Sequence, residues 1–262
     1  MPAEETILIT GCSTGIGRAT AERLVASGHT VYATARNLDS VSGLEAKGCR
    51  TMALDVTDET SMEAAVARID EEAGGIGALV NNAGYSQSGA VETLDMEALR
   101  RQFETNVFGV LETIQACLPQ LRKTRGRLVL IGSVAGYISA PGSSPYSMSK
   151  FAIRALAEAL GPELRSRGVA VTLISPGFVA SEIRQVDNRG VHHAFAKEPL
   201  PPWLVMRADV AARKIVSAAY RRRREAVVTM HGKALLWLQR FAPWVLRFAA
   251  RRGVRARSEP RR

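Results

Sequence analysis

The sequence predicts an α/β fold, in which a single doubly wound parallel sheet of about seven strands has helices on both faces. With 262 residues, of which 46% are hydrophobic, the chain can bury one substantial core. Short apolar runs alternate with mostly helical stretches, which is the order of elements expected for a parallel sheet. The runs centre on Ile7, Val31, Met52, Leu79, Val129, Val171 and Val227.

The first strand, residues 6–10, leads into a glycine-rich turn and then into a helical stretch over residues 18–27. Gly11 permits a tight turn, Gly15 lets the backbone approach a pyrophosphate, and Gly17 lets the helix pack closely on the strand. The start of the helix adds backbone amides and positive potential. A strand, a glycine turn and a helix in this order predict a dinucleotide-binding site.

The second strand, residues 29–35, is followed by Arg36, and its tip carries no acidic residue. Sites that prefer NAD hold the ribose hydroxyls with an acid at this place, whereas an arginine can pair with the 2′-phosphate of NADP. The hydroxyl of Ser13 could add a contact to that phosphate. These residues predict a preference for NADP(H). In the alternative, Arg36 only stacks on the adenine and both cofactors are accepted.

Tyr146 and Lys150 are four residues apart on a predicted helix, so their side chains would project from the same face. A phenol titrates at about pH 10, and a neighbouring cation lowers that pKa by favouring the phenolate. Ser133 follows the apolar run 128–131, which predicts a buried strand, and ligands bind where such strands end. Together the three residues predict a proton-transfer site. A helical surface pair without a catalytic role is the alternative for Tyr146 and Lys150 alone.

These and further motifs resemble the classical short-chain dehydrogenase/reductase family, in the family's order and over roughly the first 180 residues. The motifs are Thr10-Gly11-x-x-x-Gly15-x-Gly17, Asp55 after a strand, Asn81-Asn82-Ala83-Gly84, Asn106, Ser133, Tyr146, Lys150 and Pro176-Gly177. Ser181 departs from the family, which usually has threonine there, but it keeps the hydroxyl. The residues of the glycine loop are also similar to those of steroid and retinol dehydrogenases. The resemblance implies a Rossmann-type catalytic domain.

The resemblance also implies a role for each motif. Tyr146 would be the general acid or base, Ser133 would stabilise charge on the substrate oxygen, and Lys150 would bind the nicotinamide ribose. Asn106 would hold a water that links Lys150 to solvent; an amide that kinks or caps a helix is the alternative. The catalytic residues are therefore Asn106, Ser133, Tyr146 and Lys150. The cofactor-binding residues are Gly11, Ser13, Thr14, Gly15, Ile16, Gly17, Arg36, Asp55, Val56, Asn82, Ala83, Gly84, Tyr146, Lys150, Pro176, Gly177, Val179 and Ser181.

Residues 178–205 would form a lid over the substrate. Its apolar side chains favour a lipophilic substrate such as a steroid, a retinoid or a fatty compound; they are Phe178, Ile183, Val191, Phe195 and Trp203. His192 and His193 have no further ligands nearby, so no metal site is predicted. The alternatives are a reductase of acyl-carrier-bound ketoacyl substrates, a cofactor-binding scaffold without turnover, and a membrane adaptor.

The catalytic domain is predicted to span residues 1–230, followed by a basic helical extension over residues 231–262. From Arg207 onward the chain has 16 basic and 3 acidic residues. Arg240, Pro243 and Arg247 interrupt the apolar stretch 233–252, which makes a membrane-spanning helix costly. Two short helices joined near Pro243 could instead lie on an anionic membrane surface. A subunit interface, contact with the lid and a solvated basic face are the alternatives, and no nucleic acid partner is predicted.

Three cysteines, Cys12, Cys49 and Cys117, show no metal-ligand spacing, which favours a reducing compartment and no disulfide. Residues 1–6 lack the pattern of a secretory signal. We therefore expect a cytoplasmic protein that could associate peripherally with a membrane. The family resemblance further implies a homodimer or homotetramer, formed through the helices that contain Asn106 and Tyr146.

Overall fold

A seven-stranded parallel sheet forms the centre of the computed structural model, which describes residues 4–181 and 200–258. The strands follow the order β3-β2-β1-β4-β5-β6-β7, so the direction of winding reverses between β1 and β4. This confirms the predicted doubly wound sheet. The strands are β1 Thr6–Ile9, β2 Thr30–Ala35, β3 Arg50–Ala53, β4 Ala78–Asn81, β5 Arg127–Ile131, β6 Ala170–Ser175 and β7 Glu225–Val227.

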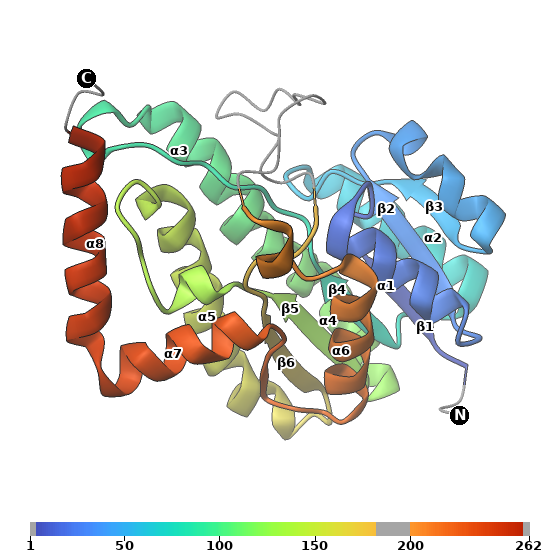
Figure 1. Ribbon diagram of the computed structural model, residues 1–262. Helices are drawn as coiled ribbons and strands as arrows, with labels where there is room; N and C mark the ends of the chain where they lie inside the picture. The colour runs from blue at the N-terminus through green and yellow to red at the C-terminus, as the bar shows by residue number, and fades with distance from the viewer. Residues whose placement is uncertain (1–3, 182–199, 259–262) are drawn as a thin grey trace.

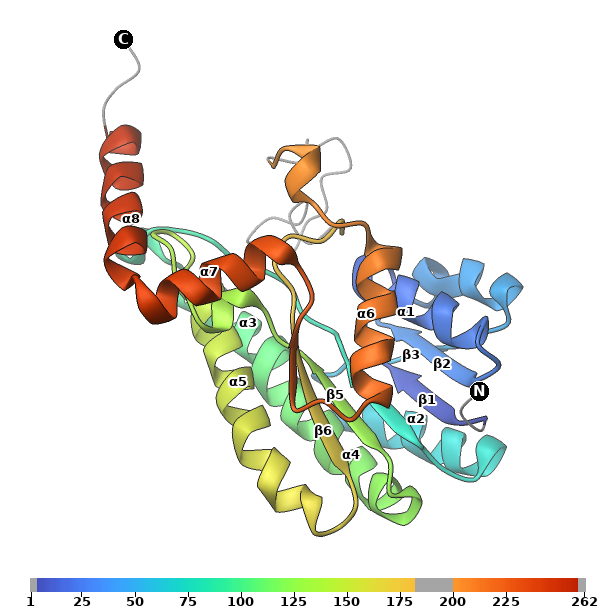
Figure 2. The ribbon, with the colours of Figure 1, turned by 60° about the horizontal axis from the view of Figure 1, so that its bottom comes forward.

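Helices cover both faces of the sheet, and Figure 2 shows α4 and α5 on one side and α1 and α6 on the other. One core cluster packs apolar residues of α2, α4 and α5 against the sheet, and a second packs residues of α1, α6 and η1 against the opposite face. The α-helices are α1 Gly15–Val25, α2 Glu59–Ala73, α3 Met96–Phe103, α4 Gly109–Thr124, α5 Ser144–Arg165, α6 Ala208–Tyr220, α7 Met230–Phe241 and α8 Pro243–Ser258.

Short helical turns connect several of these elements. They are the 3₁₀ segments η1 Leu38–Lys47, η2 Val91–Thr93, η4 Val134–Gly136 and η6 Pro202–Leu204, and the π-helical turn η3 Glu104–Phe108 between α3 and α4. The predicted first helix, residues 18–27, was placed a few residues too late. It begins at Gly15, directly after the extended residue Thr14, and ends at Val25, before a turn in which Gly28 adopts a φ of 85°.

The two C-terminal helices extend away from the sheet, with α8 at a steep angle to α7 (Figure 1). This confirms two helices that meet near Pro243, because the pyrrolidine ring at the start of α8 cannot continue the backbone hydrogen bonds of α7. In the described parts of the chain no helix is long and apolar enough to cross a membrane. α7 begins at Met230, one residue before the predicted extension 231–262, and the division into a catalytic domain and an extension stays a prediction.

Candidate active site

A large cavity of about 1560 Å³ lies where the carboxyl ends of the strands meet the C-terminal helices. Pockets for one small ligand typically measure about 300–1,000 Å³, so this one can hold a dinucleotide and a second molecule. The predicted site residues that line it are Gly11, Ser13, Thr14, Ile16, Arg36, Val56, Asn82, Ala83, Gly84, Ser133, Tyr146, Lys150, Pro176, Gly177, Val179 and Ser181. Gly15, Gly17, Asp55 and Asn106 are not in its lining.

The glycine loop brings the start of α1 to the cavity. Gly11 has a φ of 73°, and a Cβ there would lie 2.8 Å from Cα of Ala83, so only glycine fits this approach of two loops. Thr14 precedes α1 in an extended conformation, and no side chain caps the helix. The first turn of α1 also contains no acidic residue. Uncapped amides at a helix start suit a phosphate group, so the residues present fit a dinucleotide.

Gly15 and Gly17 belong to the same glycine loop but do not line the cavity. A Cβ on Gly15 would lie 2.6 Å from Cβ of Ser181, and one on Gly17 would collide with the carbonyl oxygen of Gly11. Gly17 therefore lets α1 pack directly on the turn, as predicted from its place in the motif. Gly15 lets the segment around Ser181 close over the loop.

The loop after β4 is joined to the glycine loop by hydrogen bonds. The side-chain amide of Asn82 donates to the carbonyl oxygens of Thr10 (2.9 Å) and Gly11 (2.8 Å). In return, the backbone N–H groups of Asn82 and Ala83 donate to the Thr10 hydroxyl, each at 3.0 Å. Asn82 thus fixes the relative position of the two loops at the point where the winding of the sheet reverses.

Asp55 lies beside the cavity rather than in its wall. Its carboxylate accepts hydrogen bonds from the backbone N–H (3.0 Å) and the hydroxyl (2.8 Å) of Thr57. Val56 and Thr57 line the cavity instead. Arg36, directly after β2, is exposed and lines the cavity.

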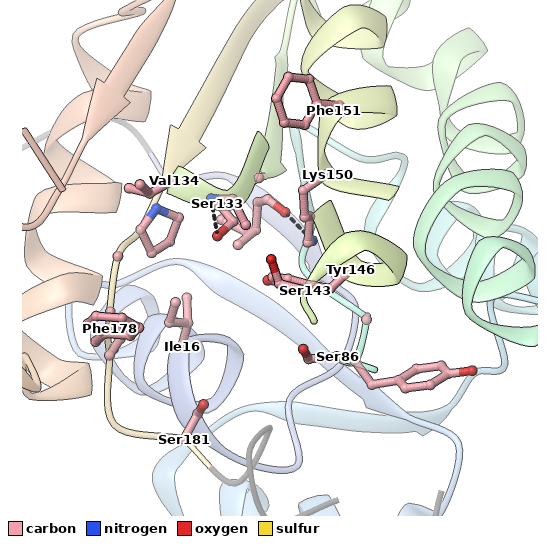
Figure 3. A pocket seen from close by; sticks show the side chains of 18 of the residues that line it. Ile16, Ser86, Ser133, Val134, Ser143, Tyr146, Lys150, Phe151, Phe178 and Ser181 are labelled. Atoms are coloured by element: carbon pink, nitrogen blue, oxygen red, sulfur yellow. Dashed lines mark hydrogen bonds between the residues drawn. The ribbon is translucent and has the colours of Figure 1, made fainter. Parts of the chain in front are cut away.

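Lys150 and Tyr146 come from the first turns of α5 and face the cavity with Ser133, which follows β5 (Figure 3). Lys150 is only 6% exposed, and its Nζ lies 5.7 Å from the centre of the Tyr146 ring. The ammonium donates one hydrogen bond of 2.9 Å to the carbonyl oxygen of Ile131. Burial lowers the pKa of Lys150 to about 8.

Asn106 does not line the cavity and lies in the π-helical turn η3. It is buried; its Oδ1 accepts from the N–H of Tyr85 (3.0 Å), while its Nδ2 donates to the Tyr85 carbonyl (2.8 Å) and to the hydroxyl of Ser149 (3.1 Å). A Cβ on Gly84 would lie 2.9 Å from Asn106 Oδ1 and 3.8 Å from Lys150 Nζ. The glycine therefore keeps open the space between Asn106 and Lys150.

The part of the lid that the structure describes is only partly in the cavity wall. Phe178 lines the cavity, but Trp203 is exposed and does not. The other predicted lid residues, Ile183, Val191, Phe195, His192 and His193, lie outside the described residues. Among residues 4–181 and 200–258 no group of metal-ligating side chains is present, and the three cysteines there are buried and free.

Sequence reasoning left contact with the lid open for the C-terminal helices but did not predict that they line the cavity. The cavity wall includes side chains of α7 and α8, namely His231, Leu235, Gln239, Leu246, Arg247, Ala249 and Ala250. No motif marks these residues. Leu235 and Gln239 are four residues apart on α7, and Leu246 and Ala250 are four apart on α8, but this spacing does not indicate which surface each helical face covers.

Comparisons with known proteins agree with this geometry. The sequence profile of the short chain dehydrogenase family matches residues 5–191. The 3-ketodihydrosphingosine reductase of Bacteroides thetaiotaomicron is 39% identical over 188 residues, which is 71% of this chain and 68% of that protein. The NADPH-dependent 3-dehydrocapnine reductase of Ornithobacterium rhinotracheale is 37% identical over 186 residues, 67% of this chain and 66% of that protein. The matched segment is thus about two thirds of each relative's own length.

The fold has solved counterparts. A crystal structure of a short-chain dehydrogenase from Streptomyces avermitilis superposes with a TM-score of 0.80 at 28% identity. The superposition covers 97% of this chain and 98% of the other. It therefore extends beyond residues 5–191, the segment that the family profile matches.

Proposed function

This chain belongs to the short-chain dehydrogenase family, and we propose that it transfers a hydride between NADP(H) and a carbonyl or secondary alcohol group of a lipophilic substrate. The observation that carries this proposal is the convergence of Ser133, Tyr146 and Lys150 on one cavity that also contains the glycine loop. A nucleotide scaffold without turnover would not need a buried lysine beside a tyrosine, because burying a cation is costly.

Tyr146 is proposed to exchange the proton with the substrate oxygen. In the reductive direction its phenol donates to the oxygen as negative charge develops there, and the Ser133 hydroxyl stabilises the same charge. Ser133 Oγ already accepts from the N–H of Ala135 at 3.1 Å, which leaves its proton available for the substrate. The Lys150 ammonium uses one proton on Ile131, so two remain for the cofactor ribose and for favouring the phenolate of Tyr146.

When bound, NADP(H) supplies or accepts the hydride. The uncapped start of α1 would hold its pyrophosphate, and Arg36 with Ser13 would hold the 2′-phosphate. Burial raises the pKa of Tyr85, while Arg101 and Arg36 oppose the shift, so both arginines bring positive charge to this end of the cavity. The similarity to a reductase named as NADPH-dependent supports NADP(H) as the cofactor.

Substitution of Arg36 tests the cofactor proposal. Arg36→Asp should lower kcat/KM with NADPH and raise it with NADH, shifting the preference by at least about tenfold, because one charged hydrogen-bonded pair is lost. Arg247→Asp makes the same charge change on α8, at the other end of the cavity, and should leave the preference unchanged. An unaltered preference in Arg36→Asp would show that Arg36 only stacks on the adenine.

The cavity supports a lipophilic substrate. Apart from the catalytic groups, much of its wall is apolar, with Ile138, Phe151, Phe178, Leu235 and Leu246 contributing. Two relatives are named as reductases of 3-keto or 3-dehydro compounds, one of them a dihydrosphingosine. We therefore place carbonyls on long apolar chains before steroids and retinoids as candidate substrates.

A substrate panel followed by NADPH absorbance tests this function. It contains 3-ketodihydrosphingosine, long-chain ketones and aldehydes, steroids, retinal and an acyl-carrier-bound 3-ketoacyl thioester. Turnover of the lipophilic carbonyls, with Tyr146→Phe inactive on the same compounds, is the expected result. Turnover of the thioester alone would support the acyl-carrier alternative. Cofactor binding with no turnover of any compound would support the scaffold alternative.

A homodimer or homotetramer is proposed to form through α4 and α5. Phe108, the last residue of η3 directly before α4, and Met148 of α5 are large apolar side chains that are exposed. Large apolar side chains left exposed on the surface can be buried by a second copy of the chain. Light scattering should give a mass above that of one chain, and Phe108→Glu should reduce it.

The C-terminal helices are proposed to bind an anionic membrane surface. Four aromatic side chains there are largely exposed: Trp237 (59%), Phe241 (64%), Trp244 (70%) and Phe248 (53%). Between residues 226 and 258 the sequence contains seven basic residues and no acidic one. Exposed aromatics next to arginines suit the boundary between lipid headgroups and acyl chains.

Co-sedimentation with vesicles tests this surface. The protein should bind vesicles that contain phosphatidylglycerol more than vesicles of phosphatidylcholine alone. The double variant Arg240→Glu/Arg251→Glu should lose this binding. The variant Arg165→Glu/Arg167→Glu, which makes the same charge change near the far end of α5 (Figure 2), should keep it. If wild type stays in the supernatant and loss of residues 231–262 breaks the oligomer, the extension is a subunit interface.

A further inference from the structure

The start of α7 brings a histidine into the candidate site that no sequence motif identifies. His231 lines the cavity, and its Nε2 accepts a hydrogen bond of 2.8 Å from the backbone N–H of Phe178, 53 residues earlier. The two rings are also stacked, with centroids 5.2 Å apart and planes 22° apart. One side chain therefore holds both the backbone and the ring of Phe178.

Thr229 holds Gly177, the residue before Phe178, in the same way. Its hydroxyl oxygen is fully buried and accepts from the N–H groups of Gly177 and Gly232, each at 3.2 Å. A Cβ on Gly177 would collide with Nε2 of His231 and lie 2.6 Å from the Thr229 hydroxyl oxygen. Position 177 therefore has to be glycine, because the start of α7 packs directly on its backbone.

Backbone groups hold the other side of this segment. The N–H of Met206 donates to the carbonyl oxygen of Phe178, and the N–H of Ala180 donates to that of Met206, both at 2.9 Å. The N–H of Val134 donates to the carbonyl oxygen of Pro176 at 2.8 Å. Among these contacts, the Phe178 amide is the one held by a titratable side chain.

We propose that His231 is a positioning residue for the nicotinamide side of the cofactor site. As a neutral acceptor it fixes the backbone of Phe178, and so presents the adjoining Val179 and Ser181 to the cofactor. This role rests on the cofactor binding proposed above. A protonated imidazole has no lone pair on Nε2 and would point an N–H at the N–H of Phe178, so protonation releases the segment.

The surroundings of His231 favour its neutral form. Burial lowers the pKa of His231, so the ring is uncharged at neutral pH. Burial is the only cause of this shift. Among the described residues, the charged side chains that share the cavity wall with His231 are Arg36, Arg101, Glu104, Lys150 and Arg247. Lys233 is exposed on α7 itself, and Lys214 of α6 donates to the carbonyl oxygen of Val228 at 2.8 Å.

Two variants separate the acceptor from the ring. His231→Gln keeps an acceptor that does not titrate, and His231→Phe keeps an aromatic ring that can stack on Phe178 but has no acceptor. The Kd of NADPH is measured by fluorescence titration of the full chain between about pH 5.5 and about pH 8, where histidine titrates. The Kd of each variant is divided by the wild-type Kd at the same pH, so that the effect of NADPH phosphate ionisation on binding cancels.

At the upper pH, His231→Gln should bind NADPH within about twofold of wild type, and His231→Phe about three- to tenfold more weakly, because it lacks one hydrogen bond. At the lower pH, wild type should fall towards His231→Phe while His231→Gln keeps its affinity. Circular dichroism without cofactor checks that the variants fold. If His231→Phe does not fold, the comparison of wild type with His231→Gln still decides the question.

Two results overturn this role. The first is that the ratio of the NADPH Kd of His231→Gln to that of wild type stays constant with pH. The second is that His231→Gln binds NADPH as weakly as His231→Phe does at the upper pH. If wild type binds NADPH and either result appears, only the role of His231 is rejected. If wild type binds no NADPH at any pH, the proposed function is rejected together with it.

Discussion

The two ends of the sheet use polar residues in opposite ways. At the amino end, polar groups pair with one another. Arg127 forms an ion pair with Glu5 and lies over the ring of Tyr220 at 4.4 Å, and the Tyr220 hydroxyl is 2.8 Å from Nε2 of His29. At the carboxyl end, polar groups line a cavity. The amino end of the sheet therefore serves stability, whereas the carboxyl end leaves its polar groups available to ligands.

Each end contains a tyrosine, and their surroundings differ accordingly. Burial raises the pKa of Tyr220 to about 12, which keeps its hydroxyl neutral and fixed in the cluster with His29 and Glu5. Tyr146 instead faces the cavity, with the ammonium of Lys150 beside its ring. The same residue type thus serves a structural role at one end and a proposed catalytic role at the other.

The largest expected effect comes from removing the hydroxyl of Tyr146. Tyr146→Phe should lower kcat by about 100- to 10,000-fold, the usual contribution of a general acid or base, with little change in thermal unfolding or in NADPH affinity. Single-turnover kinetics under saturating cofactor measure it. A variant that keeps more than about a third of the wild-type rate, with chemistry rate-limiting, would contradict the assignment.

Lys150 is the exception at the carboxyl end, since it is a buried charge whose pKa of about 8 lies below the ordinary 10.5. Lys150→Met should abolish most turnover and yet raise the free energy of unfolding at neutral pH by up to roughly 3 kcal/mol. Below about pH 8 the lysine is charged in both states, and the full burial cost is present.

The stability difference between Lys150→Met and wild type should depend on pH. Between about pH 8 and 10.5 the unfolded chain binds more protons than the folded one, so wild type gains stability as pH rises. Urea unfolding at several pH values should therefore show that the advantage of Lys150→Met shrinks over this interval. An advantage that is constant with pH would mean that the lysine carries no burial cost.

At the amino end, Tyr220→Phe should lower stability by about 1–3 kcal/mol, because it leaves His29 Nε2 and part of Glu5 buried without their hydroxyl partner. Turnover should stay within about twofold of wild type, since the cluster lies at the opposite end of the sheet from the cavity. Paired measurements of kcat and urea unfolding test both statements. A tenfold loss of kcat in a folded variant would break the division between the two ends.

The smallest expected effect concerns the charge of His29. Burial lowers its pKa, so the folded chain binds fewer protons than the unfolded one and loses stability as pH falls through the ordinary value of 6.5. His29→Gln should therefore show a shallower decline in unfolding free energy between neutral and mildly acidic pH than wild type. A loss of packing in the variant lowers the unfolding free energy equally at every pH, so it does not change the slope. Equal slopes would show that His29 does not contribute.

Local patterns accounted for most of the fold and for the residues proposed to be catalytic. The strands were found because buried parallel strands are short apolar runs, and the glycine loop because only glycine fits a turn with positive φ against a second loop. Lys150 beside Tyr146 follows from one helical turn. The hydrogen bond from the Thr57 hydroxyl to the Asp55 carboxylate was not predicted, because an aspartate can pair with a neighbouring residue as readily as with a ligand.

The sequence by itself determined the order of the elements, the glycine loop and the spacing of Tyr146 and Lys150, because each depends on residues within one turn or one strand. Only the tertiary structure decided that α7 and α8 complete the cavity and that His231 and Thr229 hold Phe178 and Gly177. These contacts join residues more than fifty positions apart. They depend on the path of the chain after β7, and no local preference of His231 or Thr229 specifies that path.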